Sequence, residues 1–338
     1  MKWNFASCVL QEVWHLQGGS FLLDSRNTDA GYEANSDEGS ISRAVSMTAQ
    51  ELIGSTLPSS DAFLQEVQRA AGTMNLRIRW AHETHFGQSE SKDLLSQREY
   101  AVLSTSSVFG PASAIADRGL LPSAISLLRD VAQQRTDGAF CAWDEMPILW
   151  SRGTAGVLFH EAIGHPAERS MTSDFFPAWL EVRDLPLQSG LGELWRDDVG
   201  ERTREANLRE ESPRALRRAS YRQPLSMRLT NVVCSSTASE SIDLPERYIE
   251  VIAVAGGEYD PPADRVTLAV SCSNLVEGGH RSALTSFRYS ATRGAIAASL
   301  QVCGSRIVPY PGVLCSDDGQ TLPVGTFSPD LLTRPLRR

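Results

Sequence analysis

The spacing of apolar residues predicts two helices in the first part of the chain. In residues 61–74 the large apolar side chains fall on one face of a helix, and Asp61 stands where an N-cap is expected. A second apolar face covers residues 122–134, which begin with a proline, a residue favoured in the first helical turn. Residues 98–104 predict a strand, and residues 1–60, rich in Ser, Gly, Asp and Asn, predict short strands joined by turns.

The pattern changes after residue 180. From residue 181 to residue 222, acidic and basic residues replace most large apolar ones, which predicts an exposed charged helix or a mobile excursion. Beyond residue 226, apolar and polar residues alternate between Gly, Pro and Ser, which is typical of strands. The predicted strands cover residues 227–233, 248–254, 266–272 and 300–308.

These patterns predict a fold of the α/β (α+β) class. An N-terminal α/β domain, residues 1–145, is followed by a β-rich C-terminal domain, residues 146–338, in which a helix with metal-ligand residues lies against β-sheet. The length of 338 residues is enough for two domains of ordinary size.

Composition and charge restrict the cellular compartment and the classes of partner that we expect. The net charge of -9 opposes binding to the phosphates of nucleic acids. No run reaches the roughly 20 apolar residues that span a bilayer, and Glu12 and His15 interrupt the apolar N-terminal stretch too early for a signal peptide. The 6 cysteines are spread along the chain, unlike a disulfide scaffold, so reduced thiols are expected. We therefore expect a cytoplasmic protein without nucleic-acid or membrane partners.

Two histidines and a glutamate form the strongest chemical signal in the sequence. They are His160, Glu161 and His165, and they follow an apolar lead-in with helical spacing. Neutral imidazole is the commonest metal ligand in proteins, and a neighbouring carboxylate can act as a base towards water. The pattern predicts a zinc-dependent hydrolytic site, and spacing alone leaves open the alternative of a satisfied polar patch.

The distance between the two histidines restricts the geometry. Ligands four residues apart are separated by about 40° around a helix, but His160 and His165 are five apart and would diverge by about 140°. The side chains can converge if the helix widens into a π-type turn, or if it ends before His165. Gly164 and Pro166 favour such a departure, because one loosens the turn and the other disfavours helical geometry in the residue before it.

The sequence around these residues resembles a known family. Residues 160–168, His-Glu-Ala-Ile-Gly-His-Pro-Ala-Glu, resemble the His-Glu-x-x-Gly-His-x-x-Glu signature of TldD/PmbA metallopeptidases. Residues 147–158, 228–231, 256–261 and 311–325 are similar to other recurring segments of the family, in the family's order. The resemblance therefore extends over more than half of the chain.

The resemblance implies a metal centre with three protein ligands. The C-terminal block carries the family's third metal ligand, and the matching residue is Cys315. His160, His165 and Cys315 would then hold Zn²⁺ and leave a position open for catalysis. Glu161 would act as the general base, and Glu168 either orients His165 or is an ordinary surface carboxylate.

The resemblance also implies a function and a partner. It implies a zinc-dependent peptidase that cleaves peptides or unfolded segments, with the maturation of a ribosomally made peptide precursor as one specific role. Family members work with a related subunit that lacks the metal motif, so a PmbA/TldE-like subunit, or a second copy of the chain, is the expected partner. The alternatives are a non-catalytic scaffold or peptide-binding subunit of such a complex, and a metal-dependent amidase.

Other His and Cys residues are weaker candidates for metal binding. His82 and His85 are three residues apart and could share one helix face, but no third ligand stands nearby in the sequence. Cys234, Cys272 and Cys303 occur in strand-like runs, where a small buried thiol is the ordinary explanation. We assign no chemistry to these five residues.

Overall fold

The structure is a computed structural model that describes most of the chain. The described residues are 4–33, 59–88, 93–107, 110–133, 138–140, 142–193, 205–220, 222–237, 243–302, 304–317 and 319–336. Within these ranges the mixed α/β fold class is confirmed. No helix among them combines the length and the apolar character needed to cross a bilayer. The division into domains at residues 145 and 146 stays a prediction.

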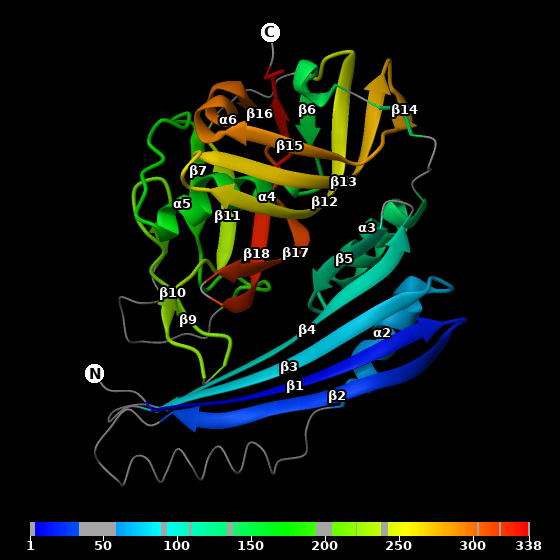
Figure 1. The fold of residues 1–338 in the computed structure, drawn as a ribbon, viewed down its shortest axis with the longest axis vertical. Helices are drawn as coiled ribbons and strands as arrows, with labels where there is room; N and C mark the ends of the chain where they lie inside the picture. Colours follow the sequence, from blue (N-terminus) through cyan, green and yellow to red (C-terminus); the bar gives the residue numbers. More distant parts are fainter. Residues whose placement is uncertain are drawn as a thin grey trace.

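A curved antiparallel sheet with strand order β2-β1-β3-β4-β5 forms the lower part of the molecule in Figure 1. Its strands are β1 (Asn4–Gln17), β2 (Ser20–Glu33), β3 (Leu76–Gln88), β4 (Asp93–Ser107) and β5 (Gly110–Ala116). Helix α2 (Asp61–Ala71) packs against helix α3 (Leu121–Gln133), and α3 packs against β4 and β5. The apolar faces of both helices are buried, as their spacing predicts.

Two details of the N-terminal prediction are wrong. Residues 4–33 form two strands of 14 residues instead of several short ones. β2 is the edge strand of the sheet, and most of its side chains are exposed. An exposed strand can contain the polar residues that are usual in turns, and these residues led to the wrong prediction. Asp61 is the first residue of α2, and Ser60 is the N-cap. Residues 34–58, part of the predicted short strands, lie outside the described residues.

Two further sheets form the upper part of the described structure (Figure 1). Their strand orders are β17-β18-β11-β7-β8 and β14-β13-β12-β6-β19-β16, with β15 paired to β13. The strands of the first are β7 (Leu180–Asp184), β8 (Ala206–Asn207), β11 (Asn231–Ser236), β17 (Val308–Asp317) and β18 (Gln320–Ser328). Those of the second are β6 (Ile148–Trp150), β12 (Arg247–Asp260), β13 (Arg265–Glu277), β14 (His280–Ala283), β15 (Phe287–Thr292), β16 (Leu300–Val302) and β19 (Leu331–Thr333). The remaining elements are the pair β9 (Leu216–Arg217) and β10 (Ser226–Met227), a 3-10 turn (Trp143–Glu145) and helix α6 (Arg293–Ser299).

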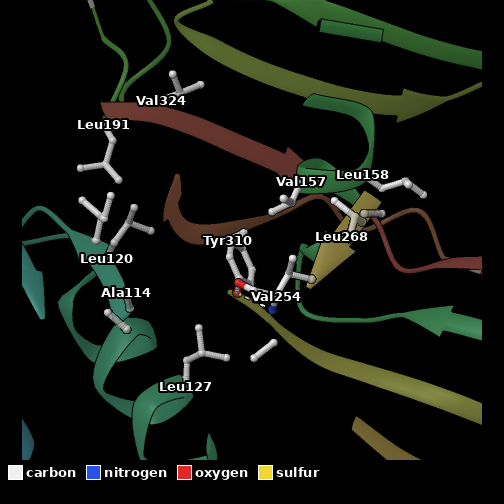
Figure 2. Packing of buried hydrophobic residues seen from close by; sticks show 14 of the residues in the cluster. Ala114, Leu120, Leu127, Val157, Leu158, Leu191, Val254, Leu268, Tyr310 and Val324 are labelled. Atoms are coloured by element: carbon white, nitrogen blue, oxygen red, sulfur yellow. Dashed lines mark hydrogen bonds between the residues drawn. The ribbon is translucent and has the colours of Figure 1, made fainter. Parts of the chain in front are cut away.

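Helix α4 (Thr154–Phe159) lies between these two sheets. It contacts β12 on one side and β11, β17 and β18 on the other, and all of its residues are buried. A Cβ added to Gly156 would lie 2.9 Å from Cβ of Thr326, so the helix approaches β18 as closely as glycine allows. Figure 2 shows the adjoining core, where Leu127 of α3 faces Val254 and Tyr310. The residues that follow α4 are therefore held in the interior of the protein.

The C-terminal half is β-rich, as predicted, but two strand predictions are only partly correct. Residues 248–254 and 266–272 lie within β12 and β13. Residues 227–233 are divided between β10 and β11, because the backbone N–H groups of Leu229 and Thr230 donate to side-chain carboxylates instead of to a neighbouring strand. In residues 300–308, only β16 and the first residue of β17 are strand within the described part.

The prediction of an exposed charged excursion at residues 181–222 is wrong for the residues described there. Part of the segment forms β7, β8 and β9, and three of its charged residues, Asp184, Arg217 and Arg218, are buried. Asp184 accepts hydrogen bonds from the backbone N–H (2.8 Å) and the hydroxyl (2.6 Å) of Thr230. Arg217 donates to two backbone carbonyls at 2.6 and 2.8 Å. Residues 194–204 lie outside the described ranges.

A buried carboxylate on β3 makes the N-terminal sheet sensitive to acid. Glu83 accepts a hydrogen bond from the hydroxyl of Tyr100 (2.8 Å) and lies 3.5 Å from Nε2 of His85 and 3.8 Å from Nε of Arg98. Burial by itself raises the pKa of Glu83, but these partners lower it from 4.5 to about 2. Because the folded-state pKa is depressed, the stabilisation is complete above pH 4.5 and is lost as the pH falls towards 2.

We therefore expect acid to destabilise the wild type more than Glu83→Gln. Between about pH 6 and about pH 3, the wild type should lose roughly 2 kcal/mol more free energy of unfolding than the variant. Urea unfolding at a series of pH values measures both losses. Equal losses in the two proteins would contradict the assignment.

Candidate metal centre

The helix that carries the two histidines widens where they are placed. Helix α4 continues into a π-helical turn (His160–Gly164) and then into α5 (His165–Glu168). The backbone N–H of His165 donates to the carbonyl of His160, five residues back, as a π-turn requires. Of the two geometries that the spacing left open, the π-turn is the one that forms. The two imidazole rings lie next to each other, with centroids 4.7 Å apart.

Strand β17 brings Cys315 to the same point. One ligand atom from each of His160, His165 and Cys315 lies within 4.8 Å of the others, and Nε2 of His165 is 3.6 Å from the sulfur. Gly312, with a φ of 55°, lies in a bulge of β17 directly against β5, where an added Cβ would be 2.6 Å from Cβ of Ile115. The N-terminal sheet therefore supports the strand that carries the third residue.

Three buried polar atoms at this point have no hydrogen-bond partner in the described part of the chain. Neither ring nitrogen of His160 has a hydrogen-bond partner among the described residues, although the side chain is fully buried, and the same holds for Oε2 of Glu161. Unpaired buried polar groups are unfavourable, so nearly all of them find a partner. Two imidazole nitrogens and a thiol are a donor set that suits zinc. The pKa of His160 is lowered well below 6.5, chiefly by burial, which favours the neutral form that binds metals.

Glu161 lies beside the histidines and under the cleft. Its Oε2 is 3.7 Å from Nε2 of His165, and its side chain is 4% exposed. Burial raises the pKa of Glu161 to about 7; the nearby carboxylates of Glu168 and Glu258 act in the same direction, and His165 acts against them. A Cβ added to Gly257 would be 2.6 Å from Cγ of Glu161, so β12 fixes this carboxylate by close backbone contact.

Glu168 holds the other side of His165. Its Oε2 is 2.7 Å from Nδ1 of His165, and its Oε1 accepts the backbone N–H of Leu229 at 3.0 Å. The Glu168 side chain is only 5% exposed, so it is not an ordinary surface carboxylate. Burial by itself lowers the pKa of His165, but the contacts with Cys315 and Glu168 raise it to about 11. The surroundings of His165 thus favour a positive charge at this position.

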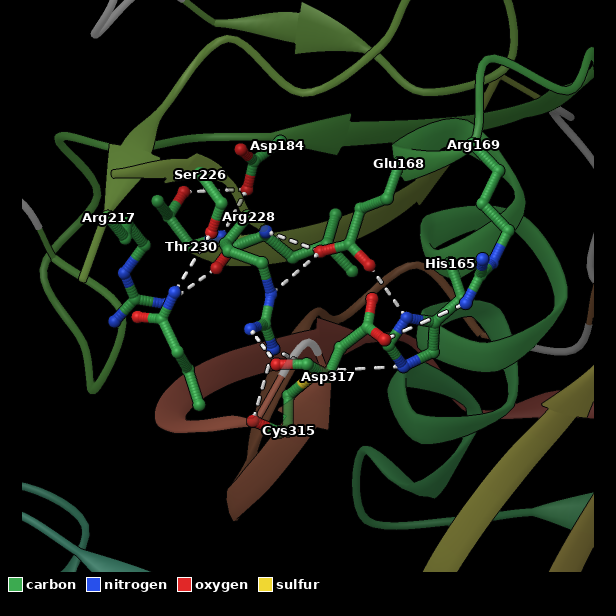
Figure 3. A network of polar contacts seen from close by, with 12 residues as sticks. His165, Glu168, Arg169, Asp184, Arg217, Ser226, Arg228, Thr230, Cys315 and Asp317 are labelled. Carbon is green, nitrogen blue, oxygen red and sulfur yellow. Dashed lines mark hydrogen bonds and ion pairs between the residues drawn. The ribbon is translucent and has the colours of Figure 1, made fainter. Parts of the chain in front are cut away.

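Arg228 belongs to the same network, although no chemical motif in the sequence predicts a role for it. Its Nη2 donates to the sulfur of Cys315 at 3.1 Å, and its Nε lies 3.5 Å from Oε1 of Glu168 (Figure 3). Burial lowers the pKa of Arg228, but Cys315 and Glu168 raise it above its ordinary value, so the guanidinium is charged. The only sequence signal was its place in residues 228–231, one of the segments similar to the family.

Residues near the metal-ligand candidates include one further acidic group. Asp317, two residues after Cys315 on β17, lies 3.6 Å from Arg169 and forms a second possible ligand group with His165 and Glu168. The second group shares His165 with the first. Within it, Glu168 already accepts a hydrogen bond from Nδ1 of this histidine. The group of His160, His165 and Cys315 is the more deeply buried of the two.

A cleft of about 520 Å³ opens above these residues. Its walls are residues 254–259 of β12, residues 310 and 312–317 of β17, and Val102, Ser113 and Ile115 from β4 and β5. The cleft therefore lies between the N-terminal sheet and the strands that surround α4, and the candidate metal ligands are in its floor.

One wall of the cleft is a strand edge. β12 pairs with β13 along its length but with β6 only at Ile249–Val251, so residues 255–260 have no second neighbouring strand among the described residues. At Val254 the hydroxyl of Tyr310 binds both the backbone N–H and the carbonyl, each at 3.0 Å. Residues 255–258 are exposed. An extended chain could therefore pair with β12 beyond Val254.

The weaker candidates do not join the site. His82 and His85 lie on β3, where residues three apart point to opposite faces, so the helix face considered for them does not exist. Cys234 and Cys272 are buried thiols in β11 and β13, as predicted. Cys303 lies outside the described residues.

Comparisons with known proteins identify the fold. The scan against protein-family models finds no match, and the search of curated proteins finds none. Among solved structures, TldE from Thermococcus kodakarensis is similar over 98% of this chain and 95% of its own, with a TM-score of 0.61 and 10% identity. A proposed modulator of a DNA gyrase from Thermotoga maritima is similar over 98% and 95%, with a TM-score of 0.55 and 10% identity. Another from Bacteroides thetaiotaomicron has a TM-score of 0.53, 98% and 94% coverage and 10% identity.

Proposed function

The chain has the TldD/PmbA-type fold, and from this premise we propose that it is a zinc-dependent peptidase. The observation that carries the proposal is the meeting of His160, His165 and Cys315 beside a buried carboxylate in the floor of a cleft. Three protein ligands are the usual number in catalytic zinc sites, which keep a position open for water or substrate. Glu161, whose Oε2 is 3.7 Å from Nε2 of His165, is the carboxylate that we propose as the general base.

The proposed roles follow from the contacts. Zinc, when bound, would polarise the scissile carbonyl and make water easier to deprotonate. Glu161 would accept the proton of the attacking water and deliver it to the leaving amine, and a pKa of about 7 suits both transfers. Glu168 would fix the Nδ1 side of His165, which leaves Nε2 directed towards Cys315. Arg228 would hold the Cys315 sulfur from the other side.

Peptides and unfolded segments are the substrates that the cleft supports best. The free edge of β12 offers backbone groups to an extended chain, and main-chain pairing of this kind depends little on sequence. Gly257 has no side chain that would keep a substrate backbone away from Glu161. Maturation of a ribosomally made peptide precursor is one role that such a cleft could serve.

Hydrolysis of unfolded substrates tests the proposed function. Denatured casein and a mixture of synthetic peptides are incubated with the protein in the presence of zinc or of a chelator, and mass spectrometry identifies new termini. The proposal expects cleavage with zinc and none with the chelator. The assay is repeated with any subunit that co-purifies with the protein, because we also propose a PmbA/TldE-like subunit, or a second copy, as the partner. Absence of zinc-dependent cleavage in both assays would contradict the peptidase.

The second candidate is a non-catalytic scaffold or peptide-binding subunit. The observation that favours it is the similarity to TldE, the name of one of the solved structures. A scaffold should bind the same peptides without turnover, and Glu161→Gln should not change its activity as a partner. A metal-dependent amidase would instead hydrolyse small amides and spare casein. The cytoplasmic location stays a prediction.

A further inference from the structure

The helix of the candidate metal centre has Pro166 at a position where a regular α-helix would have a hydrogen-bond donor. In a regular helix, the carbonyl of Ala162 would accept the N–H of the residue four positions later, and that residue is Pro166, which has none. Ala162 is fully buried in the π-turn, between His160 and His165. Because a buried carbonyl without a donor is unfavourable, a donor from outside the helix would stabilise this turn.

Arg293, at the start of α6, supplies that donor. Its Nε donates to the carbonyl of Ala162 at 2.7 Å in a fully buried hydrogen bond. Its Nη2 donates to the carbonyl of Thr172 at 3.0 Å and to the hydroxyl of Ser173. The guanidinium is also 3.3 Å from the carboxylate of Asp264. One side chain therefore ties the chain before His165 to the chain after α5.

The position of Arg293 is unfavourable apart from these contacts and the rings of Phe175 and Tyr259, whose centroids lie 5.0 and 5.9 Å from the guanidinium carbon. Its side chain is 2% exposed, and removing a cation from water is costly even when a carboxylate is near. It also stands in the first turn of α6, the end of a helix that disfavours positive charge. Core packing alone would be served better by an apolar side chain. The hydrogen bonds to the π-turn and to residues 172–173 give a reason for a guanidinium here.

We propose that Arg293 is a positioning residue of the metal centre. Its side chain donates the hydrogen bond to the Ala162 carbonyl that Pro166 cannot donate, and it also binds residues 172–173. These bonds fix the backbone before and after His165, so that His160 and His165 face the same point. The inference rests on the metal centre of the proposed function. It concerns the geometry of the ligands, and it assigns Arg293 no contact with substrate.

Metal affinity of the full-length chain tests this role. The variants are Arg293→Met, which removes every donor, and Arg293→Lys, which keeps the charge and one donor group. The control is Arg209→Met, because Arg209 also donates to backbone carbonyls, those of Leu180 (2.8 Å) and Phe176 (2.9 Å), but makes no hydrogen bond to the π-turn among the described residues. Zinc dissociation constants are measured by chelator competition, and the visible spectrum of the cobalt-loaded protein reports ligand geometry. Circular dichroism confirms that each variant is folded.

Arg293→Met should weaken zinc binding by about 10- to 100-fold, the usual effect of losing a group that orients metal ligands, and should alter the cobalt spectrum. Arg293→Lys should recover part of the affinity, and it serves as the test if the methionine variant does not fold. Arg209→Met should bind zinc like the wild type even if it is less stable. Unchanged affinity and cobalt spectra in folded Arg293 variants would overturn the inference and leave the proposed function intact. Absence of zinc binding in the wild type would overturn both.

Discussion

Glu161→Gln is expected to lower zinc-dependent peptide hydrolysis by about 10²- to 10⁴-fold, the usual contribution of a general base. The amide of glutamine has nearly the shape of the carboxylate but cannot accept the proton of the attacking water. Glu161 is not among the three proposed ligands, so the zinc content should not change. The rate of peptide cleavage and the zinc content of the same preparation measure the two effects.

Glu258→Gln is the matched control, because Glu258 lines the same cleft but is exposed. Its cleavage rate should stay within a few-fold of the wild type, since surface charges are screened by solvent. Wild-type turnover in Glu161→Gln would show that another group takes the proton. Loss of zinc from Glu161→Gln would instead show that Glu161 is a ligand.

Gly257→Ala is expected to lower the cleavage rate by about 10²-fold, because small displacements of catalytic groups have effects of this size. An added Cβ would lie 2.6 Å from Cγ and 2.7 Å from Oε1 of Glu161, too close for either group to stay in place. Oε1 would have to move away from the cleft, or β12 would have to shift. The measured quantity is kcat/KM on one cleaved peptide, together with the zinc content.

Gly256→Ala separates this contact from a general effect of substitution in β12. A Cβ at Gly256 has no atom within 4 Å, and neither glycine has a φ in the left-handed region. Gly256→Ala should therefore keep the wild-type cleavage rate and the wild-type thermal stability. Equal losses in the two variants would mean that the strand edge, and not the position of Glu161, limits the reaction.

The local geometry at the candidate site was predictable because it depends on neighbours in the sequence. The five-residue spacing of His160 and His165, with Gly164 and Pro166 beside them, required a departure from the α-helix, and the π-turn is one of the two solutions considered. Periodicity likewise predicted α2 and α3, because each helix buries one continuous apolar face. In these cases the signal lies within a few turns of the chain.

The residues that support the site could not be predicted in this way. Arg228 meets Cys315 across 87 positions of sequence, and Arg293 meets Ala162 across 131. Both are arginines, a residue type that is usually exposed. Only the packing of strands and helices shows that these two are buried. The prediction of an exposed charged segment at residues 181–222 was wrong for the same reason, because Asp184 and Arg217 bind buried polar groups of other segments.

The metal content of the purified protein is the most direct test of the proposed centre. The wild type is compared with His160→Ala and Cys315→Ala, with Cys272→Ala as the control for loss of a buried thiol elsewhere. We expect about one zinc per chain in the wild type and in Cys272→Ala, as for a single catalytic site, and loss of zinc in the other two. Folded wild type that binds no zinc when it is supplied, or full zinc content in both His160→Ala and Cys315→Ala, would contradict the account.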